Sequence, residues 1–235
     1  MLAGFARAVS AMAETLAISV PTVVEAARGK LSMESCDARL RSWASRILEQ
    51  AGATVEVRGQ SHLHPGETYV VMSNHRSLYD VPVLFDSFPG RLRMVAKSEL
   101  FRIPIWGRAM QVAGFIDVDR KNSQRAIASL ERAKLVLESG TSVWIAPEGT
   151  RSRSGELGPF KTGGFMLALG TGHKILPVAL RGTERILPAD GALVQRGAHV
   201  EVQFGEPVDP ASYGRDARDA LVARVRADIA ALLTR

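Results

Sequence analysis

The chain has 235 residues, 46% of them hydrophobic, which is enough to bury one sizeable core and predicts one compact domain. Its formal charge of +6 favours an anionic partner, namely nucleic acid, a phosphate ester or acidic lipid, without choosing among them. A single cysteine, Cys36, excludes an internal disulfide and favours a reducing compartment. It is interpreted as a structural or surface thiol, because Glu34 and Asp37 do not form an activating neighbourhood.

The first predicted element is an amphipathic helix at the N-terminus. Arg7, Glu14 and Pro21 interrupt the apolar run of the first 27 residues, so neither a signal peptide nor a membrane-spanning helix fits it well. Apolar residues recur at intervals of three and four, which places them on one helical face. They are Leu2, Phe5, Val9, Met12 and Leu16.

A second amphipathic helix is predicted around residues 40–48, flanked by Arg39, Arg41 and Arg46. The two helices favour a platform lying on a membrane, with Trp43 at the interface and the arginines reaching lipid phosphates. Packing of both helices on the core explains the same pattern equally well. We interpret residues 1–52 as membrane-associating N-terminal helices. The apolar residues of the second helix are Leu40, Trp43, Ala44, Ile47 and Leu48.

From residue 53 to residue 235, short β-branched runs alternate with helical patterns, which indicates an α/β domain. The fold class is therefore a single α/β domain with a central mixed β-sheet flanked by helices, preceded by the N-terminal helix pair. Strands are predicted at 53–58, 68–73, 92–96, 114–118, 142–146, 175–180 and 199–204. Helices are predicted at 78–87, 122–138, 162–171 and 216–233.

The first polar cluster follows the strand at 68–73 and contains His75, Ser77 and Asp80. Residues five apart do not share a face of a regular helix, so His75 is placed in the loop and Asp80 in the first helical turn, directed back towards it. Such a carboxylate holds one imidazole nitrogen protonated and leaves the other to accept a proton from a substrate hydroxyl. Ser77 is the rival nucleophile, although a helix-start cap explains it more simply.

The second cluster, residues 147–152, follows the strand at 142–146. Gly149 allows close backbone approach, and the forked guanidinium of Arg151 suits a phosphate monoester. Lys161 adds a point charge near a helix start. These residues predict an anion pocket, for which an ordinary solvated turn is the alternative.

A third segment, Gly114 to Arg120, reads as a strand that ends in a basic residue. Between residues 91 and 125, eight basic residues outnumber Glu99, Asp117 and Asp119, which predicts a positive field between the two clusters. An apolar stretch at 100–106 fits either acyl chains and bilayer or ordinary core packing. The basic residues are Arg91, Arg93, Lys97, Arg102, Arg108, Arg120, Lys121 and Arg125.

Together these segments resemble the glycerolipid acyltransferase family typified by 1-acylglycerol-3-phosphate O-acyltransferase. The family's four blocks occur in order across roughly residues 53–190. They are the Asn-His block at Asn74 to Asp80, the arginine-ended block at Gly114 to Arg120, the block at Glu148 to Ser152, and the proline-containing strand at Ile175 to Leu180.

The resemblance implies that His75 is the general base and Asp80 its orienting partner. It implies transfer of an acyl group from acyl-CoA or acyl-carrier protein to the sn-2 hydroxyl of 1-acylglycerol 3-phosphate, giving phosphatidic acid, with no metal or redox cofactor. It also implies a peripheral or monotopic enzyme at the cytoplasmic face of the cell membrane. The substrate-binding residues it implies are Asn74, Arg120, Glu148, Gly149, Thr150, Arg151, Ser152 and Lys161.

Other functions remain open at this point. Another acceptor, such as glycerol 3-phosphate or a different lyso-lipid, would use the same motifs, and a non-catalytic protein that binds anionic lipid would share them. A nucleic-acid-binding domain is disfavoured because only 6% of the residues are aromatic and no nucleic-acid motif occurs. A metal hydrolase is disfavoured because the five histidines show no established ligand spacing.

Overall fold

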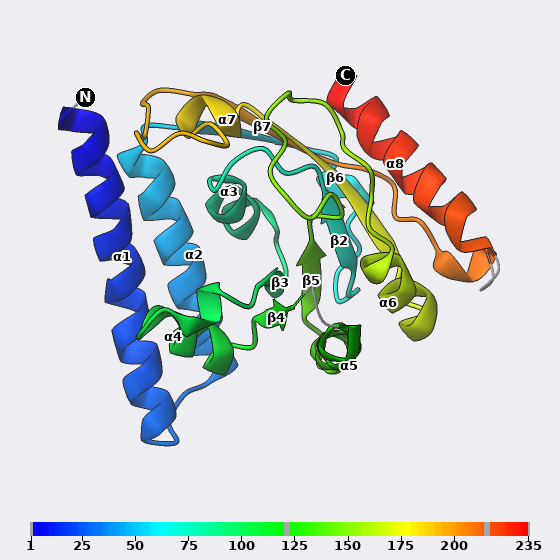
Figure 1. Ribbon diagram of the computed structural model, residues 1–235, viewed down its shortest axis with the longest axis horizontal. Helices are drawn as coiled ribbons and strands as arrows, with labels where there is room; N and C mark the ends of the chain where they lie inside the picture. The colour runs from blue at the N-terminus through cyan, green and yellow to red at the C-terminus, as the bar shows by residue number, and fades with distance from the viewer. Residues whose placement is uncertain (1, 120–122, 214–216, 235) are drawn as a thin grey trace.

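The computed structural model describes residues 2–119, 123–213 and 217–234, which form one seven-stranded mixed sheet with helices on both faces (Figure 1). The strand order is β1-β7-β6-β2-β5-β3-β4. Within the described residues, every neighbouring pair of strands is parallel except β6 and β7. The strands are β1 (Thr54–Arg58), β2 (Val70–Ser73), β3 (Leu92–Lys97), β4 (Ile116–Val118), β5 (Ser142–Ile145), β6 (Ile175–Arg181) and β7 (His199–Phe204).

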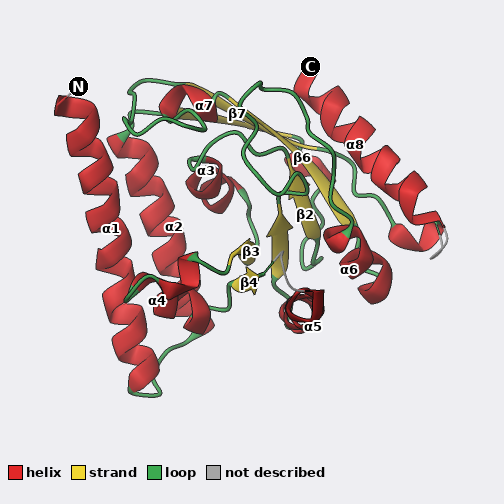
Figure 2. Ribbon diagram, viewed as in Figure 1, coloured by secondary structure: helices red, strands yellow, loops and turns green. Residues whose placement is uncertain are grey.

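Alternate side chains of the central strands bury into two separate cores, one on each face of the sheet. Val71 packs with helices α2 (Met33–Gln50) and α3 (Asp80–Ser87), whereas its neighbours Val70 and Met72 pack on the other face. That second face is covered by helices α5, α6 and α8 (Figure 2). Their bounds are α5 (Ser123–Glu138), α6 (Gly163–Thr171) and α8 (Arg218–Thr234). The α/β class with a mixed sheet is therefore confirmed.

Strands β5, β2 and β6 lie side by side and run in the same direction. Their carboxyl ends therefore meet at one edge of the sheet, which is where ligands usually bind in open α/β sheets. The segments that leave these ends begin at Asn74, Ala146 and Gly182. The topology thus brings together two clusters that lie about seventy residues apart in the chain, at residues 74–80 and 147–152.

Every predicted strand is confirmed, with ends that differ by a few residues at most. The apolar stretch after β3 adopts short elements that the sequence analysis did not predict. These and the remaining short elements are η1 (Gln60–His62), η2 (Leu100–Arg102), α4 (Trp106–Val112), α7 (Thr183–Ile186) and η3 (Pro210–Ser212).

Helix α1 (Leu2–Ala27) lies alongside α2, and polar groups join the two helices. The Trp43 indole donates to Thr15 Oγ1 at 3.1 Å, and Arg46 pairs with Glu14 at 2.7 Å. Arg39 likewise pairs with a glutamate of α1. Helix α1 therefore provides partners for Trp43, Arg39 and Arg46, and their predicted contact with lipid stays a prediction.

The apolar face predicted for α1 is exposed, as Leu2, Phe5 and Met12 show with 88%, 63% and 68% of their surface accessible. By length and composition alone α1 is apolar enough to cross a membrane, since an 18-residue window has a mean hydropathy of 1.3. The expectation that a membrane-spanning helix fits these residues poorly is therefore too strict, because Arg7, Glu14 and Pro21 leave that window apolar enough. By contrast, α2 belongs to the folded core, to which it contributes Ala44 and Ile47. Helix α2 thus shares a core with the α/β domain, and the predicted boundary between residues 52 and 53 stays a prediction.

Candidate active site

Asn74, the first residue after β2, anchors the segment that carries the candidate base. Its side chain is 1% exposed and makes two hydrogen bonds to the main chain of Leu180 on β6. Nδ2 donates to the carbonyl and Oδ1 accepts from the N–H, both at 2.8 Å. The amide side chain thus continues the pairing of β2 with β6 beyond the last strand residue, and the predicted contact of Asn74 with substrate gains no support from this position.

His75 and Asp80 form a hydrogen bond of 2.7 Å between Nδ1 and Oδ2. The geometry predicted from their spacing is therefore confirmed, with His75 in the loop and Asp80 in the first turn of α3. Asp80 is fully buried, and its Oδ2 also accepts from the N–H groups of Arg76 and Ser77 at 2.8 and 3.0 Å. The carboxylate therefore fixes the hydrogen on Nδ1, which leaves Nε2 of the partly exposed imidazole as an acceptor.

The Ser77 hydroxyl is fully occupied by main-chain partners. It donates to the carbonyl of Leu187 at 2.7 Å and accepts from the N–H of Tyr79, just before α3, at 3.0 Å. Since Ser77 is also completely buried, it stabilises the turn and is not placed to attack a substrate. Ser77 is therefore structural, but its interpretation as a helix cap is wrong, because Tyr79 is the N-cap of α3 and the Ser77 hydroxyl braces the turn before it.

Trp144 on β5 supports the imidazole from one side. The two rings are edge to face, with centroids 6.1 Å apart. The indole Nε1 donates to Ser73 Oγ at 2.9 Å, and this hydroxyl donates to the Asn74 carbonyl at 2.8 Å. The sequence analysis missed Trp144, although its place in the strand before the second cluster was a signal that could have found it.

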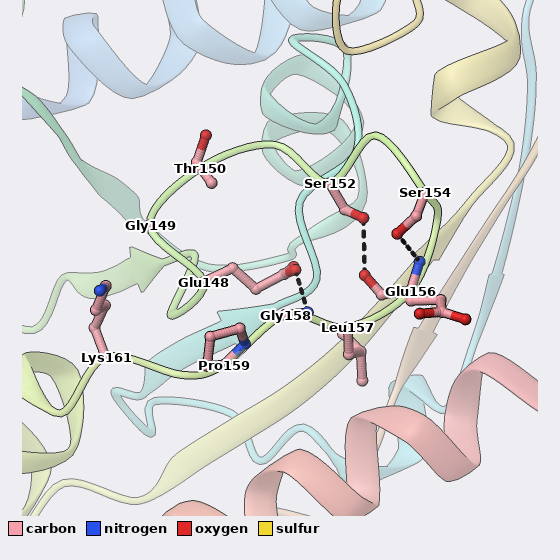
Figure 3. Close-up of a pocket in the computed structure, with 10 residues that line it drawn as sticks. All are labelled: Glu148, Gly149, Thr150, Ser152, Ser154, Glu156, Leu157, Gly158, Pro159 and Lys161. Carbon is pink, nitrogen blue, oxygen red and sulfur yellow. Dashed lines mark hydrogen bonds between the residues drawn. The ribbon is translucent and has the colours of Figure 1, made fainter.

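The second cluster belongs to a loop, residues 147–161, whose ends are joined by a 2.7 Å hydrogen bond from the N–H of Lys161 to the carbonyl of Pro147. Glu148 is 7% exposed and points inwards (Figure 3). Its Oε1 accepts from the N–H of His75 and its Oε2 from the N–H of Gly158, both at 2.9 Å. The N–H of Ser152 donates to the His75 carbonyl at 2.7 Å. This loop therefore holds the main chain of His75 on both sides.

A cavity of about 470 Å³ opens within this loop, lined in part by Gly149, Thr150 and Lys161. Gly149 adopts a φ of 76°, which favours glycine. Thr150 and Lys161 are exposed, and Arg151 is half-buried. Across the described ranges, neither Arg151 nor Lys161 forms an ion pair with a carboxylate. Both cations are therefore available to an anion bound beside the cavity.

The Ser152 side chain serves the loop itself. Its hydroxyl donates to the carbonyl of Glu156 at 2.8 Å (Figure 3). It also accepts from the N–H of Gly155 at 3.2 Å. Arg76, which the sequence analysis did not single out, donates to the carbonyl of Gly155 and lies 3.9 Å from a carboxylate oxygen of Glu184. It therefore ties the loop to the segment after β6.

The predicted basic field is only partly at the surface. Arg93 is 3% exposed and pairs with Asp37 of α2 at 2.6 Å, and Arg91 lies 3.3 Å from the same carboxylate. These charges therefore join β3 to α2 and are partly neutralised there. Arg120 and Lys121 lie outside the described residues.

The acyltransferase family model matches residues 54–181. Relatives named 1-acyl-sn-glycerol-3-phosphate acyltransferase include BAT2, chloroplastic, from Brassica napus, 34% identical over 71% of this chain and 48% of its own length. The human form, alpha, is 41% identical over 55% of this chain and 46% of its own. The Haemophilus influenzae protein of that name is 30% identical over 74% of this chain and 72% of its own.

The chain spans about half the length of the plant and human relatives. The crystal structure of the 1-acyl-sn-glycerophosphate acyltransferase PlsC from Thermotoga maritima has the same fold, with a TM-score of 0.73 and 24% identity over 97% of this chain and 98% of its own. Because the family match covers more than half of the chain and the bacterial relative aligns along most of its length, this chain belongs to the acyltransferase family.

Proposed function

We propose that the protein transfers a fatty acyl group from acyl-CoA or acyl-carrier protein to the sn-2 hydroxyl of 1-acylglycerol 3-phosphate, giving phosphatidic acid for phospholipid synthesis. The observation that carries the proposal is the 2.7 Å pair of His75 and Asp80. It lies beside a loop whose Arg151 and Lys161 form no ion pair with any described carboxylate. The relatives named 1-acyl-sn-glycerol-3-phosphate acyltransferase support the same acceptor.

In this reaction Nε2 of His75 takes the proton of the acceptor hydroxyl while the oxygen attacks the thioester carbonyl. The new C–O bond forms, the C–S bond breaks, and the proton passes from the imidazolium to the departing thiolate. Asp80 stabilises the transient imidazolium. General base catalysis of this kind typically contributes about 10² to 10⁴ in rate. No atom changes oxidation state in this step, so it consumes no oxidant or reductant, and we propose that it proceeds without a metal or redox cofactor.

The loop supplies the binding energy that orients the acceptor. The guanidinium of Arg151 and the ammonium of Lys161 bind the phosphate, with Arg120 as a further proposed contact. Holding both substrates next to His75 removes much of the entropic cost of a reaction between two molecules.

We assign the protein to the cytoplasmic face of the cell membrane, as a peripheral or monotopic enzyme. The exposed apolar face of α1 supports this, because its Leu2, Phe5 and Met12 side chains have no covering partner in the described part of the chain. The charged groups Arg7 and Glu14 of the same helix bind Val194 and Arg46 of this protein. A helix with one side tied to the fold and an apolar side exposed suits a position in the plane of the interface.

The test offers the purified protein labelled acyl-CoA and acyl-carrier protein donors with 1-acylglycerol 3-phosphate, glycerol 3-phosphate and lyso-lipids that lack a terminal phosphate. We expect product only with the phosphomonoester lyso-lipid, and loss of turnover in His75→Ala with acceptor binding retained. Preference for glycerol 3-phosphate would move the assignment to a different acceptor. Binding of anionic lipid without transfer by any donor would contradict enzymatic function.

A further inference from the structure

Both oxygens of the Glu148 carboxylate are hydrogen-bonded within the protein. Each of its oxygens accepts a hydrogen bond of 2.9 Å from a main-chain N–H, one of His75 and one of Gly158. The side chain is nearly buried and comes from the same loop as Arg151 and Lys161. An ionised carboxylate can only accept hydrogen bonds, as can a fully ionised phosphate, and the two repel each other. Glu148 is thus poorly suited to be a phosphate ligand.

The same contacts make Glu148 the central member of a set of hydrogen bonds that surrounds the His75 main chain. Glu148 holds its N–H, the N–H of Ser152 holds its carbonyl, and the Arg76 side chain reaches the carbonyl of Gly155. These hydrogen bonds therefore join the loop that forms the cavity to the segment that carries the imidazole. Asp80 fixes the ring of His75, whereas the loop fixes its main chain.

We propose that Glu148 is a positioning residue that acts through the His75 main chain and sets the distance between the imidazole and an acceptor held by the loop. This inference rests on the proposed acyl transfer, because it assigns a task to Glu148 within that reaction. It places Glu148 outside the set of groups that touch the acceptor.

The two roles predict different kinetics. A residue that sets the position of the base changes turnover, since a displacement of about 1 Å at a reacting group can cost about a hundredfold in rate. A residue that binds the acceptor equally in the ground and transition states changes KM with kcat preserved. For a positioning Glu148 we therefore expect kcat to fall roughly tenfold to a hundredfold, and the acceptor KM to change by less than about threefold.

Two variants separate the effect of side-chain length at position 148 from the effect of side-chain charge. Glu148→Gln keeps the length of the side chain but offers one amide oxygen where two N–H groups need an acceptor. Glu148→Asp keeps the charge but is one methylene shorter, so it cannot span both N–H groups. We expect both variants to lose kcat.

Glu67→Gln is the matched control. Glu67 is a partly buried carboxylate that accepts from the Tyr69 hydroxyl at 2.8 Å and pairs with Lys174 at 2.7 Å, before β2 and thus away from the edge where His75 lies. We expect this control to retain wild-type kcat and KM. Thermal unfolding of each variant shows whether it is folded at the assay temperature.

Hydrogen exchange of the His75 amide in the wild-type protein gives a test that needs no variant. A hydrogen bond to a nearly buried carboxylate should protect this amide by at least an order of magnitude relative to the exposed Thr150 amide. Exchange as fast as that of Thr150 would overturn the proposal even if the Glu148 variants did not fold.

The outcomes distinguish this inference from the proposed function. A tenfold rise in acceptor KM with unchanged kcat in Glu148→Gln, or wild-type kinetics in both variants, would overturn the positioning role while acyl transfer stands. Absence of transfer by the wild-type protein, or full turnover by His75→Ala, would instead remove the proposed function itself.

Discussion

At the scale of single residues, one carboxylate oxygen organises the candidate base. Asp80 Oδ2 accepts from the imidazole and from two main-chain N–H groups, so it orders the His75 ring and the turn before α3 together. Three donors on one buried oxygen leave little freedom for the ring to rotate. The orientation of the imidazole is therefore set before any substrate arrives.

The first prediction concerns Asp80→Asn, which keeps the size of the side chain and removes its charge. The amide can turn its N–H₂ group towards His75, which places the hydrogen on the wrong imidazole nitrogen and leaves the imidazolium unstabilised. We expect kcat to fall by roughly 10³ to 10⁴ with a smaller change in acceptor KM. Steady-state kinetics with circular dichroism as a folding control measure this, and a variant that keeps a tenth of wild-type activity would contradict the assignment.

The second prediction concerns Cys36, which is 2% exposed. Burial raises the pKa of its thiol, chiefly because the thiolate loses its hydration inside the protein. A raised pKa favours the neutral thiol, so the reactive thiolate is scarcer in the folded chain than in the unfolded chain at the same pH. We expect alkylation by iodoacetamide at pH 8 to be at least tenfold slower in native protein than in guanidinium chloride. Equal rates would show that the thiol is accessible.

The sequence predicted the local contacts of the candidate site but not the contacts between residues far apart in the chain. The pairing of His75 with Asp80 is local, because five residues of chain and one helix start determine it. The partners of Asn74 and Glu148 are main-chain groups contributed by β6 and by the loop around Gly158. Contacts of that kind depend on the strand order of the sheet, which no local spacing reports.

At the scale of elements, a buried ion pair joins α2 to β3. Arg93 donates to Asp37 at 2.6 Å and also to the carbonyl of Ala113. The guanidinium lies 6.0 Å from the centroid of the Phe115 ring, which adds a cation–π contact. This pair couples the N-terminal helices to the sheet, so the basic residues after β3 are not simply a surface for lipid.

The third prediction follows from that burial. Asp37→Ala leaves the Arg93 charge buried with no carboxylate against it, which typically costs about 3 to 5 kcal/mol in the free energy of unfolding. The exposed pair of Lys134 and Glu138, with 3.9 Å between charged atoms, provides the comparison. Glu138→Ala should cost less than about 0.5 kcal/mol. Equilibrium denaturation in urea measures both, and equal losses would contradict the burial argument.

The strands were predictable because β-branched runs bounded by turn residues are a strong local signal. The short helix α4 was not, since it depends on close packing rather than periodicity. A Cβ at Gly107 would lie 2.3 Å from the carbonyl oxygen of Phe101, and Ile105 before it adopts a φ of 66°. Both features arise where η2 packs against α4. The apolar residues of this stretch are compatible with several other secondary structures.

At the scale of the whole molecule, the site and the exposed face of α1 are parts of one folded body. α1 is joined to the segment before β7 by the Arg7 side chain, which donates twice to the carbonyl of Val194. The nearby Leu187 carbonyl accepts from Ser77 beside the candidate base. An enzyme that takes one substrate from a lipid surface needs such a rigid relation between its membrane contact and its catalytic groups.

The last prediction tests the proposed membrane contact of α1. Phe5→Glu with Met12→Glu places two charges on the apolar face of α1, where the side chains are 63% and 68% exposed and pack on little of the protein. Membrane binding of an interfacial helix scales with its buried apolar area and with attraction to anionic lipid. We expect co-sedimentation with vesicles of phosphatidylcholine and phosphatidylglycerol to fall at least tenfold, with thermal stability unchanged.

Leu135→Glu is the control, because Leu135 is equally exposed, at 65%, but lies on α5. The control should bind vesicles as the wild-type protein does. The double variant should lose transfer to acceptor embedded in vesicles yet keep transfer to a short-chain acceptor dissolved as monomers, because its catalytic groups are intact. Loss of both activities would mean that the α1 face supports the fold rather than the membrane contact. Equal vesicle binding by all three proteins would place the lipid contact on another surface.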